Sequence, residues 1–288
     1  PMQYFYEYGG RSEQVANRAR QSAALYGERG AVYQRRESGA IYNLYAGRTI
    51  PAFAYREMCN YYLNYDFSIV LTLLLCLYGI IGTFVSERET QMDMLLLVSP
   101  NGGRKTALAK ILAATLFLLL TSLWFSLLDL IGFAASFQTL EGLALPVFAI
   151  PNFAEVSVNL SIFQYVLLSA VLKCAGAWVM GMLWLLVSMF WKNALLPFVI
   201  DFALCMALTV SGAACAYSNF FWTKVLNPYS LLTNRVLLGK TEFVNLGGFP
   251  VLTWQAAAWF ALIAGLAAAA MIYFLSAENG HRCVRRAK

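Results

Sequence analysis

Three ionisable residues lie inside long apolar runs of the sequence, namely Asp129, Lys173 and Asp201. A charged group is costly in the hydrocarbon of a bilayer, so such residues are functional candidates by default. Lys173 lies eleven residues into its run, which at ~1.5 Å per residue of helix is about 16 Å deep, near the midplane. One hypothesis is a proton relay that couples transport to a proton gradient. The alternative is a structural ion pair, in which Asp129 reaches Lys173 and Asp201 competes from the other side.

Two aspartates in apolar runs also allow intramembrane aspartyl proteolysis. Asp129 and Asp201 meet its minimal requirement, but neither stands in a Tyr-Asp or Gly-x-Gly-Asp setting. The single histidine, His281, lies near the C-terminus, so the runs contain no H-E-x-x-H motif and no serine–histidine pair. The six cysteines include no C-x-x-C pair, which argues against a disulfide framework or a metal site. A passive channel or a sensor is a third possibility. We expect no catalytic residue, metal or cofactor on this chain.

The runs that hold these residues have the length of membrane spans. Hydrophobic residues make up 60% of the 288-residue chain and charged residues 12%, against ~45–50% and ~25% in soluble domains. A bilayer core takes roughly 20 apolar residues of helix. Small residues on the last run, Gly265 and 267–270, indicate close helix packing within the chain or across a dimer. The predicted fold is all-α: a small helical domain over 1–65 and a polytopic transmembrane helical bundle over 66–288, with five spans at about 67–85, 107–137, 162–190, 194–217 and 252–275.

Basic residues set the predicted orientation. Lys and Arg gather after the first run, after the third run and in the C-terminal tail, whereas 138–161 has none. Because such an excess marks cytoplasmic loops, we expect a multi-pass protein of the cell membrane with a cytoplasmic C-terminus and an extracytosolic segment 1–65. That polar segment contains no signal peptide, so we also expect a sixth, N-terminal span upstream of Pro1. Its interleaved Tyr and Arg residues can stack on bases, but the predicted side of the membrane excludes a nucleic-acid partner, and the net charge of +6 reflects topology.

The segment between the first two runs carries the most specific pattern. Ser86 followed by Glu89 fits a capping box, and Pro100 with Asn101-Gly102-Gly103 stops a helix. We therefore expect a short amphipathic helix over about 87–99 on the cytoplasmic face. An interfacial helix that rests on lipid is the alternative, although such helices are usually rich in Lys and Arg. The apolar side of this helix consists of Met92, Leu95 and Leu96. Glu89 and Asp93 form an acidic strip beside it.

These features resemble the coupling segment of ABC transporter permeases of the type 2 export family. The matching residues are Glu87-Arg88-Glu89, Asp93, Leu95-Leu96-Leu97, Ser99-Pro100, Gly103-Arg104 and Ala109-Lys110. The family has six spans, a large external segment after the first, the cytoplasmic helix between the second and third, and a partly membrane-dipping external segment before the last. By this resemblance the five runs are spans two to six, and 218–251, with Asn227-Pro228, is the external re-entrant segment. Many members place Gly-Thr after the acidic cluster, where this chain has Thr90-Gln91.

The resemblance implies a transporter subunit and not an enzyme. Such a permease moves a substrate out across the cell membrane by alternating access, driven by a separate ATPase subunit. The implied partners are two ATPase copies, which bind ATP and Mg, a second permease copy as a homodimer or heterodimer, and the lipid bilayer. The chain contains no G-x-x-x-x-G-K-[ST] run, so ATP hydrolysis is expected on the partner. The residues implied at the ATPase contact are Glu87, Arg88, Glu89, Met92, Asp93, Leu95, Leu96 and Arg104.

Overall fold

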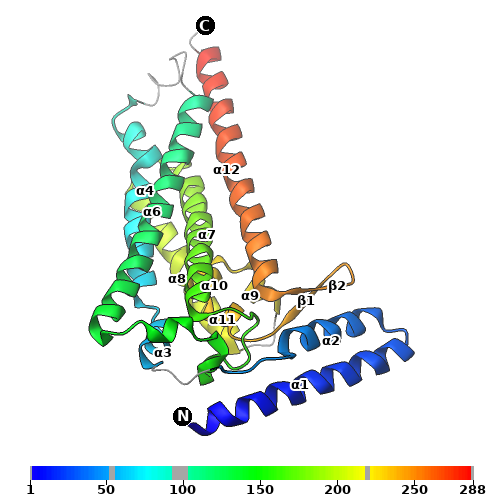
Figure 1. Cartoon of the computed structure of the whole chain (residues 1–288). Helices are drawn as coiled ribbons and strands as arrows, with labels where there is room; N and C mark the ends of the chain where they lie inside the picture. Colours follow the sequence, from blue (N-terminus) through cyan, green and yellow to red (C-terminus); the bar gives the residue numbers. More distant parts are fainter. Residues whose placement is uncertain (1, 52–55, 93–102, 218–220, 287–288) are drawn as a thin grey trace. The chain divides into compact units, whose positions relative to one another are not determined.

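The computed structural model describes residues 2–51, 56–92, 103–217 and 221–286. Helices dominate these residues, and the strands among them form one antiparallel hairpin (Figure 1). Five helices are long and apolar enough to cross a membrane. The chain is therefore an all-α, multi-pass membrane protein, and the predicted fold class is confirmed. The five helices are α4 (Phe67–Glu89), α6 (Arg104–Phe137), α7 (Ile162–Ser188), α8 (Leu195–Tyr217) and α12 (Thr253–Arg286).

The chain divides into two compact units, each built from three parts of the sequence. Unit 1 comprises Pro1–Tyr65, Leu128–Val171 and Asn234–Ala257. Unit 2 comprises Asp66–Leu127, Leu172–Thr233 and Ala258–Lys288. The predicted domain 1–65 thus folds together with two later segments, which the sequence did not indicate.

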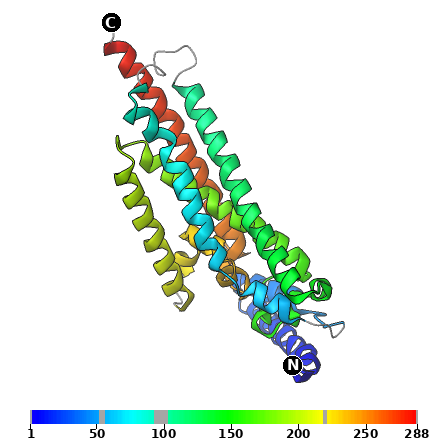
Figure 2. The same cartoon turned by 90° about the vertical axis from the view of Figure 1, so that its left-hand side faces the viewer.

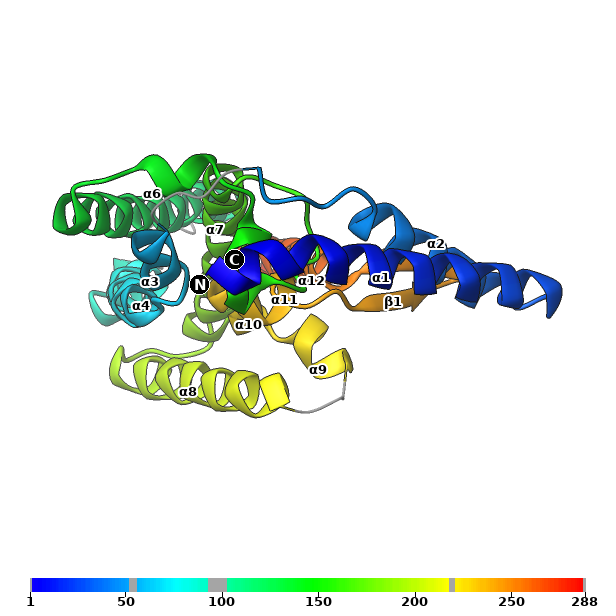
Figure 3. The same cartoon turned by 60° about the horizontal axis from the view of Figure 1, so that its bottom comes forward.

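Two helices and a β-hairpin form one part of unit 1. Helices α1 (Met2–Glu28) and α2 (Val32–Tyr45) pack against each other (Figures 1 and 3), and β2 (Phe249–Leu252) lies against α2. β2 pairs with β1 (Phe243–Leu246) around Gly247 and Gly248, both of which have positive φ, as a tight hairpin turn requires. Arg36 of α2 donates to the carbonyl oxygen of Gly248 at 3.1 Å and lies 4.4 Å from the centre of the Phe249 ring.

The rest of unit 1 surrounds the connection between α6 and α7. This connection makes three 3-10 turns, Glu141–Ala144, Val147–Ala149 and Pro151–Phe153, and the short helix α3 (Glu57–Leu63) contacts the first of them. The backbone N–H of Ser157 donates to the carbonyl oxygen of Leu238, the last residue of α11 (Arg235–Leu238), at 2.9 Å. The apolar side chains buried along the connection include Val147, Phe148, Ile150, Phe153 and Val156.

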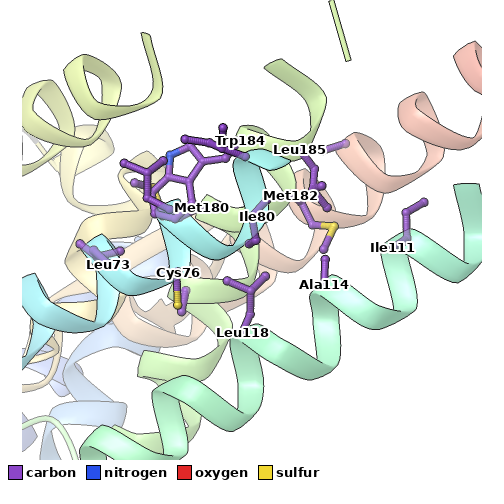
Figure 4. Packing of buried hydrophobic residues seen from close by; sticks show 14 of the residues in the cluster. Leu73, Cys76, Ile80, Ile111, Ala114, Leu118, Met180, Met182, Trp184 and Leu185 are labelled. Atoms are coloured by element: carbon purple, nitrogen blue, oxygen red, sulfur yellow. The ribbon is translucent and has the colours of Figure 1, made fainter. Parts of the chain in front are cut away.

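The core of unit 2 lies where α4, α6 and α7 meet. The long helices of this unit lie roughly parallel to one another (Figure 2). Ile80, Leu118 and Trp184, one from each helix, are buried in it (Figure 4). Gly181 allows this approach, because a Cβ atom there would overlap the side chains of Leu118 and Ile80. Gly265 of α12 is similarly covered by the ring of Trp178. The small residue predicted at a helix contact therefore packs within the chain.

The outer sides of the spans are apolar and exposed. On α6, Leu112, Leu116 and Leu120 recur every fourth residue, and each has more than half of its surface accessible. Val199, Met206 and Val210 of α8 are exposed in the same way. Apolar faces of this size are unfavourable in water and match the acyl chains of a bilayer, which agrees with the assignment of these helices as spans.

The segment predicted as re-entrant, 218–251, contains three short helices and most of the β-hairpin. The helices are α9 (Phe221–Leu226), α10 (Pro228–Thr233) and α11. Asn227 closes the turn between α9 and α10, because its Oδ1 accepts from the backbone N–H of Tyr229 at 2.9 Å while its Nδ2 donates to the carbonyl oxygen of Leu208 at 2.8 Å. The turn at Asn227-Pro228 is thus tied to α8. Its membrane-dipping character stays a prediction.

Candidate functional site

Three consecutive charged residues at the end of α4 each contact another part of unit 2, namely α6 or the α7–α8 connection. Glu87 pairs with Lys110 of α6, with 2.5 Å between Oε2 and Nζ. Arg88 donates from Nη1 to the carbonyl oxygen of Trp191 at 3.0 Å. Glu89 accepts from the backbone N–H of Ala194 through Oε1 at 3.0 Å. Successive helical residues point about 100° apart, so one turn can serve three neighbours. We name this set of contacts the α4 junction: Glu87, Arg88, Glu89, Lys110 and the backbone groups of Trp191 and Ala194.

The ion pair of the α4 junction is partly buried. The Lys110 side chain is 12% exposed and that of Glu87 28%. The Nζ of Lys110 also lies 4.2 Å from the centre of the Phe84 ring, a cation–π distance. Opposite charges attract more strongly where water is partly excluded than at an open surface. The pair therefore holds the end of α4 to the first turns of α6.

The other two contacts hold the connection between α7 and α8. Ala194 directly precedes Leu195, the first residue of α8, and the first N–H groups of a helix have no partner within it. The Glu89 carboxylate supplies one and is favoured by the positive end of the helix dipole. Arg88 binds the carbonyl oxygen of Trp191 in the same connection. The end of α4 thus fixes the α7–α8 connection at two backbone groups.

The start of α6 is anchored to α12. The Arg104 guanidinium lies 5.8 Å from the centre of the Tyr273 ring, and the Ser276 hydroxyl donates to the carbonyl oxygen of Gly103 at 3.3 Å. The described residues on either side of 93–102 are therefore anchored within unit 2, at the end of α4 and at the start of α6. Together these contacts link α4, α6, α12 and the α7–α8 connection.

The residues expected at an ATPase contact divide into three groups. Glu87, Arg88 and Glu89 have partners within unit 2, and Arg104 faces Tyr273. Met92 is exposed, with 57% of its surface accessible. The remaining three, Asp93, Leu95 and Leu96, lie outside the described residues, as does the predicted coupling helix from residue 93 onward.

The predicted start of the coupling helix is wrong. α4 continues through Glu89, and the Ser86 hydroxyl donates to the carbonyl oxygen of Gly82 at 2.7 Å. Ser86 is therefore an interior residue of α4 and caps no new helix. The helix ends at Glu89 with Thr90 as its C-cap, and Gln91 has a φ of 55°. Residues 87–89 thus belong to a span and not to a separate helix.

The three intramembrane ionisable residues fall in different surroundings. Asp129 belongs to unit 1, whereas Lys173 and Asp201 belong to unit 2. Lys173 lines a small cavity whose polar groups are hydroxyls of α4 and α6, among them Ser68 and Ser122. Asp201 is fully buried on α8, and neither carboxyl oxygen has a hydrogen-bond partner within the described part of the chain. The Asp129–Lys173 pair and the proton relay stay predictions.

The sequence pattern identified Glu87 and Glu89 of the α4 junction but not the groups that they and Arg88 contact. Glu87 and Lys110 carry opposite charges near the ends of two spans joined by a short segment, and this signal could have indicated the pair. Trp191 and Ala194 contribute only backbone groups, which no residue type reveals. Comparison of the chain with models of known protein families gives no match, and comparison with curated proteins gives none.

Proposed function

We propose that the chain is the membrane-spanning permease subunit of an ATP-binding cassette exporter in the cell membrane. Residues 1–65 lie outside the cell and the C-terminus lies in the cytoplasm. The subunit works with a second permease copy and with two copies of a separate ATPase, which binds ATP and Mg. Closure of the two ATPases drives the permease between inward-facing and outward-facing states and moves a substrate outward.

The α4 junction is the observation that carries this proposal. Alternating access requires that a movement on the cytoplasmic side reach several spans together. Glu87, Arg88 and Glu89 hold α6 and the α7–α8 connection to the end of α4, and the other end of the segment 90–103 is anchored to α12. A force on this segment is therefore shared among spans and does not bend one helix alone. Such a set of contacts suits a subunit that receives mechanical work from a partner.

We assign different roles to the charged residues at the end of α4 and to Met92. The polar side chains at the end of α4 are engaged inside unit 2, so they transmit force and are not free to bind the ATPase. Met92 is exposed three residues after Glu89, the last residue of α4, and supplies the first apolar contact with the partner. Aromatic residues, Met and Arg are enriched at the cores of protein interfaces.

The test is affinity purification of the full-length protein from its own cells. The expected result is co-purification of an ATPase that carries the P-loop motif and of a second permease copy. Burial of a Met side chain is worth about 1.5–3 kcal/mol, so Met92→Ser should weaken ATPase recovery roughly ten- to a hundredfold. Asn193→Ser changes another exposed residue near the junction and should leave recovery unchanged.

The outcomes separate two claims. Purified protein that brings no ATPase contradicts the proposed function. Recovery that is equal for Met92→Ser and Asn193→Ser contradicts only the role of Met92.

A further inference from the structure

Arg48, which follows α2 in unit 1, is buried although it carries a charge. Only 3% of its surface is exposed. Nε donates to Oδ1 of Asn159 at 2.7 Å, and Nη2 donates to the carbonyl oxygen of Val156 at 2.9 Å. The third nitrogen, Nη1, has no hydrogen-bond partner, and Arg48 forms no ion pair within the described ranges. The guanidinium is therefore held in place by polar groups that leave its charge uncompensated.

Aromatic rings surround the guanidinium but do not neutralise it. Its central carbon lies 4.3 Å from the centre of the Tyr45 ring and 5.2 Å from that of Phe148. Phe148 is in turn stacked on Tyr8, with 5.3 Å between ring centres. A ring attracts a cation through its quadrupole and carries no net charge. A buried cation is stable when an anion pairs with it, so the surroundings of Arg48 call for an anionic ligand.

A cavity of about 350 Å³ opens beside Arg48. Its lining includes Thr49, Pro146, Phe148, Asn159 and Ser161 besides Arg48, and none of its lining residues is acidic. Ser161 directly precedes Ile162, the first residue of the long helix α7, whose N-terminal end carries partial positive charge. The cavity therefore combines a buried guanidinium with the positive end of a helix dipole.

The position of the cavity along the chain indicates the kind of anion. α7 is one of the five membrane-spanning candidates and begins one residue after Ser161. The lining residue Ser161 thus lies where a span leaves the hydrocarbon, at the level of the lipid headgroups, which carry phosphate. We propose that this cavity binds a phosphate group through Arg48, either the phosphate of an anionic lipid headgroup or that of a soluble compound. This binding does not depend on which substrate the proposed exporter transports.

The experiment measures thermal unfolding of the full-length protein in a phosphate-free maltoside detergent. One arm adds inorganic phosphate and the other adds phosphatidylglycerol to the micelles, each against sodium chloride of equal ionic strength. The expected result is a rise in unfolding temperature in at least one arm. A rise with inorganic phosphate assigns a soluble ligand chemistry, and a rise with phosphatidylglycerol alone assigns a lipid headgroup.

Two variants locate the effect at the cavity. Arg48→Gln removes the charge, and Thr49→Glu places a carboxylate at an exposed lining position while leaving the hydrogen bonds of Arg48 in place. Gln21→Glu adds the same charge at an exposed position on α1, outside the lining. Thr49→Glu should raise the ligand concentration needed for half of the shift about tenfold or more, the loss of roughly one ionic contact. Gln21→Glu should behave as the parent.

Two results would overturn the proposal. The first is a parent protein whose unfolding temperature responds to neither phosphate nor phosphatidylglycerol. The second is an equal response in the parent and in Thr49→Glu, which would place the bound anion elsewhere. Since Thr49→Glu keeps Arg48 and its partners, the second result stands even if Arg48→Gln fails to fold.

Discussion

Removing either partner of the Glu87–Lys110 ion pair should lower the free energy of unfolding, and removing Glu87 should lower it more than removing Lys110. Loss of a hydrogen bond to a charged group costs about 1.5–3 kcal/mol, and more when the group left behind is buried. Glu87→Gln leaves Lys110, which is 12% exposed, without its carboxylate, and should lower the free energy of unfolding by about 2–3 kcal/mol. Lys110→Met leaves Glu87, which is 28% exposed and can hydrate, and should cost less, about 1–2 kcal/mol.

The double variant Glu87→Gln/Lys110→Met measures the coupling directly. Because neither charge is then left alone, its cost should fall short of the sum of the single costs by about 1–3 kcal/mol. The assay is equilibrium unfolding in mixed micelles of maltoside and dodecyl sulfate, followed by tryptophan fluorescence. The matched control is the pair of Glu7 and Arg11 on α1, whose side chains are 45% and 71% exposed at 3.6 Å. Loss of that pair should cost less than about 0.5 kcal/mol. Additive effects of Glu87→Gln and Lys110→Met would show that the two charges do not stabilise each other.

Four further variants are tested in the same unfolding assay. Leu118→Ala should lower the free energy of unfolding by about 2–5 kcal/mol, because it leaves a cavity in the fully buried core of unit 2. Gly265→Leu should lower it by at least about 1–3 kcal/mol, because the new side chain overlaps Trp178. Stability equal to that of the parent in either variant would contradict the packing described for that residue. Asp201→Leu should raise the free energy of unfolding by about 1–3 kcal/mol, since it removes a buried carboxyl that has no hydrogen-bond partner among the described residues; a loss of stability would reveal a stabilising partner. Burial raises the pKa of Glu37 above its ordinary value of 4.5, so the folded state favours the protonated carboxyl, and stability should fall as the pH rises above 4.5 through the raised pKa; Glu37→Gln should remove this fall.

The sequence was sufficient to predict the spans because one physical constraint determines them. A bilayer requires a minimum length of apolar helix, and the lengths of the apolar runs can be counted directly in the sequence. The third span, predicted at 162–190, is observed as Ile162–Ser188, and the fourth, predicted at 194–217, as Leu195–Tyr217. The exposure of Leu112 and Leu116 and the burial of Leu118 on the same helix were not predictable, because packing partners decide which face of a uniformly apolar helix meets lipid.

Local patterns failed where two conformations satisfy the same groups. Ser86 and Glu89 match a capping box, yet a serine inside a helix can also donate to the carbonyl oxygen four residues before it, as Ser86 does to Gly82. The spacing alone cannot tell these two arrangements apart. The continuous apolar character up to Val85 was the competing signal, since it favours an uninterrupted helix through the membrane boundary.

Distant contacts to backbone groups were beyond sequence reasoning. Arg88 and Glu89 bind Trp191 and Ala194, more than one hundred positions away in the chain, through a carbonyl oxygen and an N–H that every residue type carries. The burial of Arg48 could not be predicted either, because its partner Asn159 lies 111 residues later in the chain. Such sites emerge only when the fold brings the segments together.

The most direct test of the proposed function is the nucleotide response of the purified assembly. The full-length protein and its co-purifying ATPase are reconstituted together, and cysteines are placed at Met92 of the permease and on the ATPase surface for crosslinking. The proposed function predicts a Met92→Cys crosslink to the ATPase whose yield changes on addition of ATP and Mg, and a lower ATPase rate on assembly with Glu87→Gln than with the parent permease. Absence of any ATPase from the purified protein, or a crosslink yield equal to that of Asn193→Cys, would contradict it.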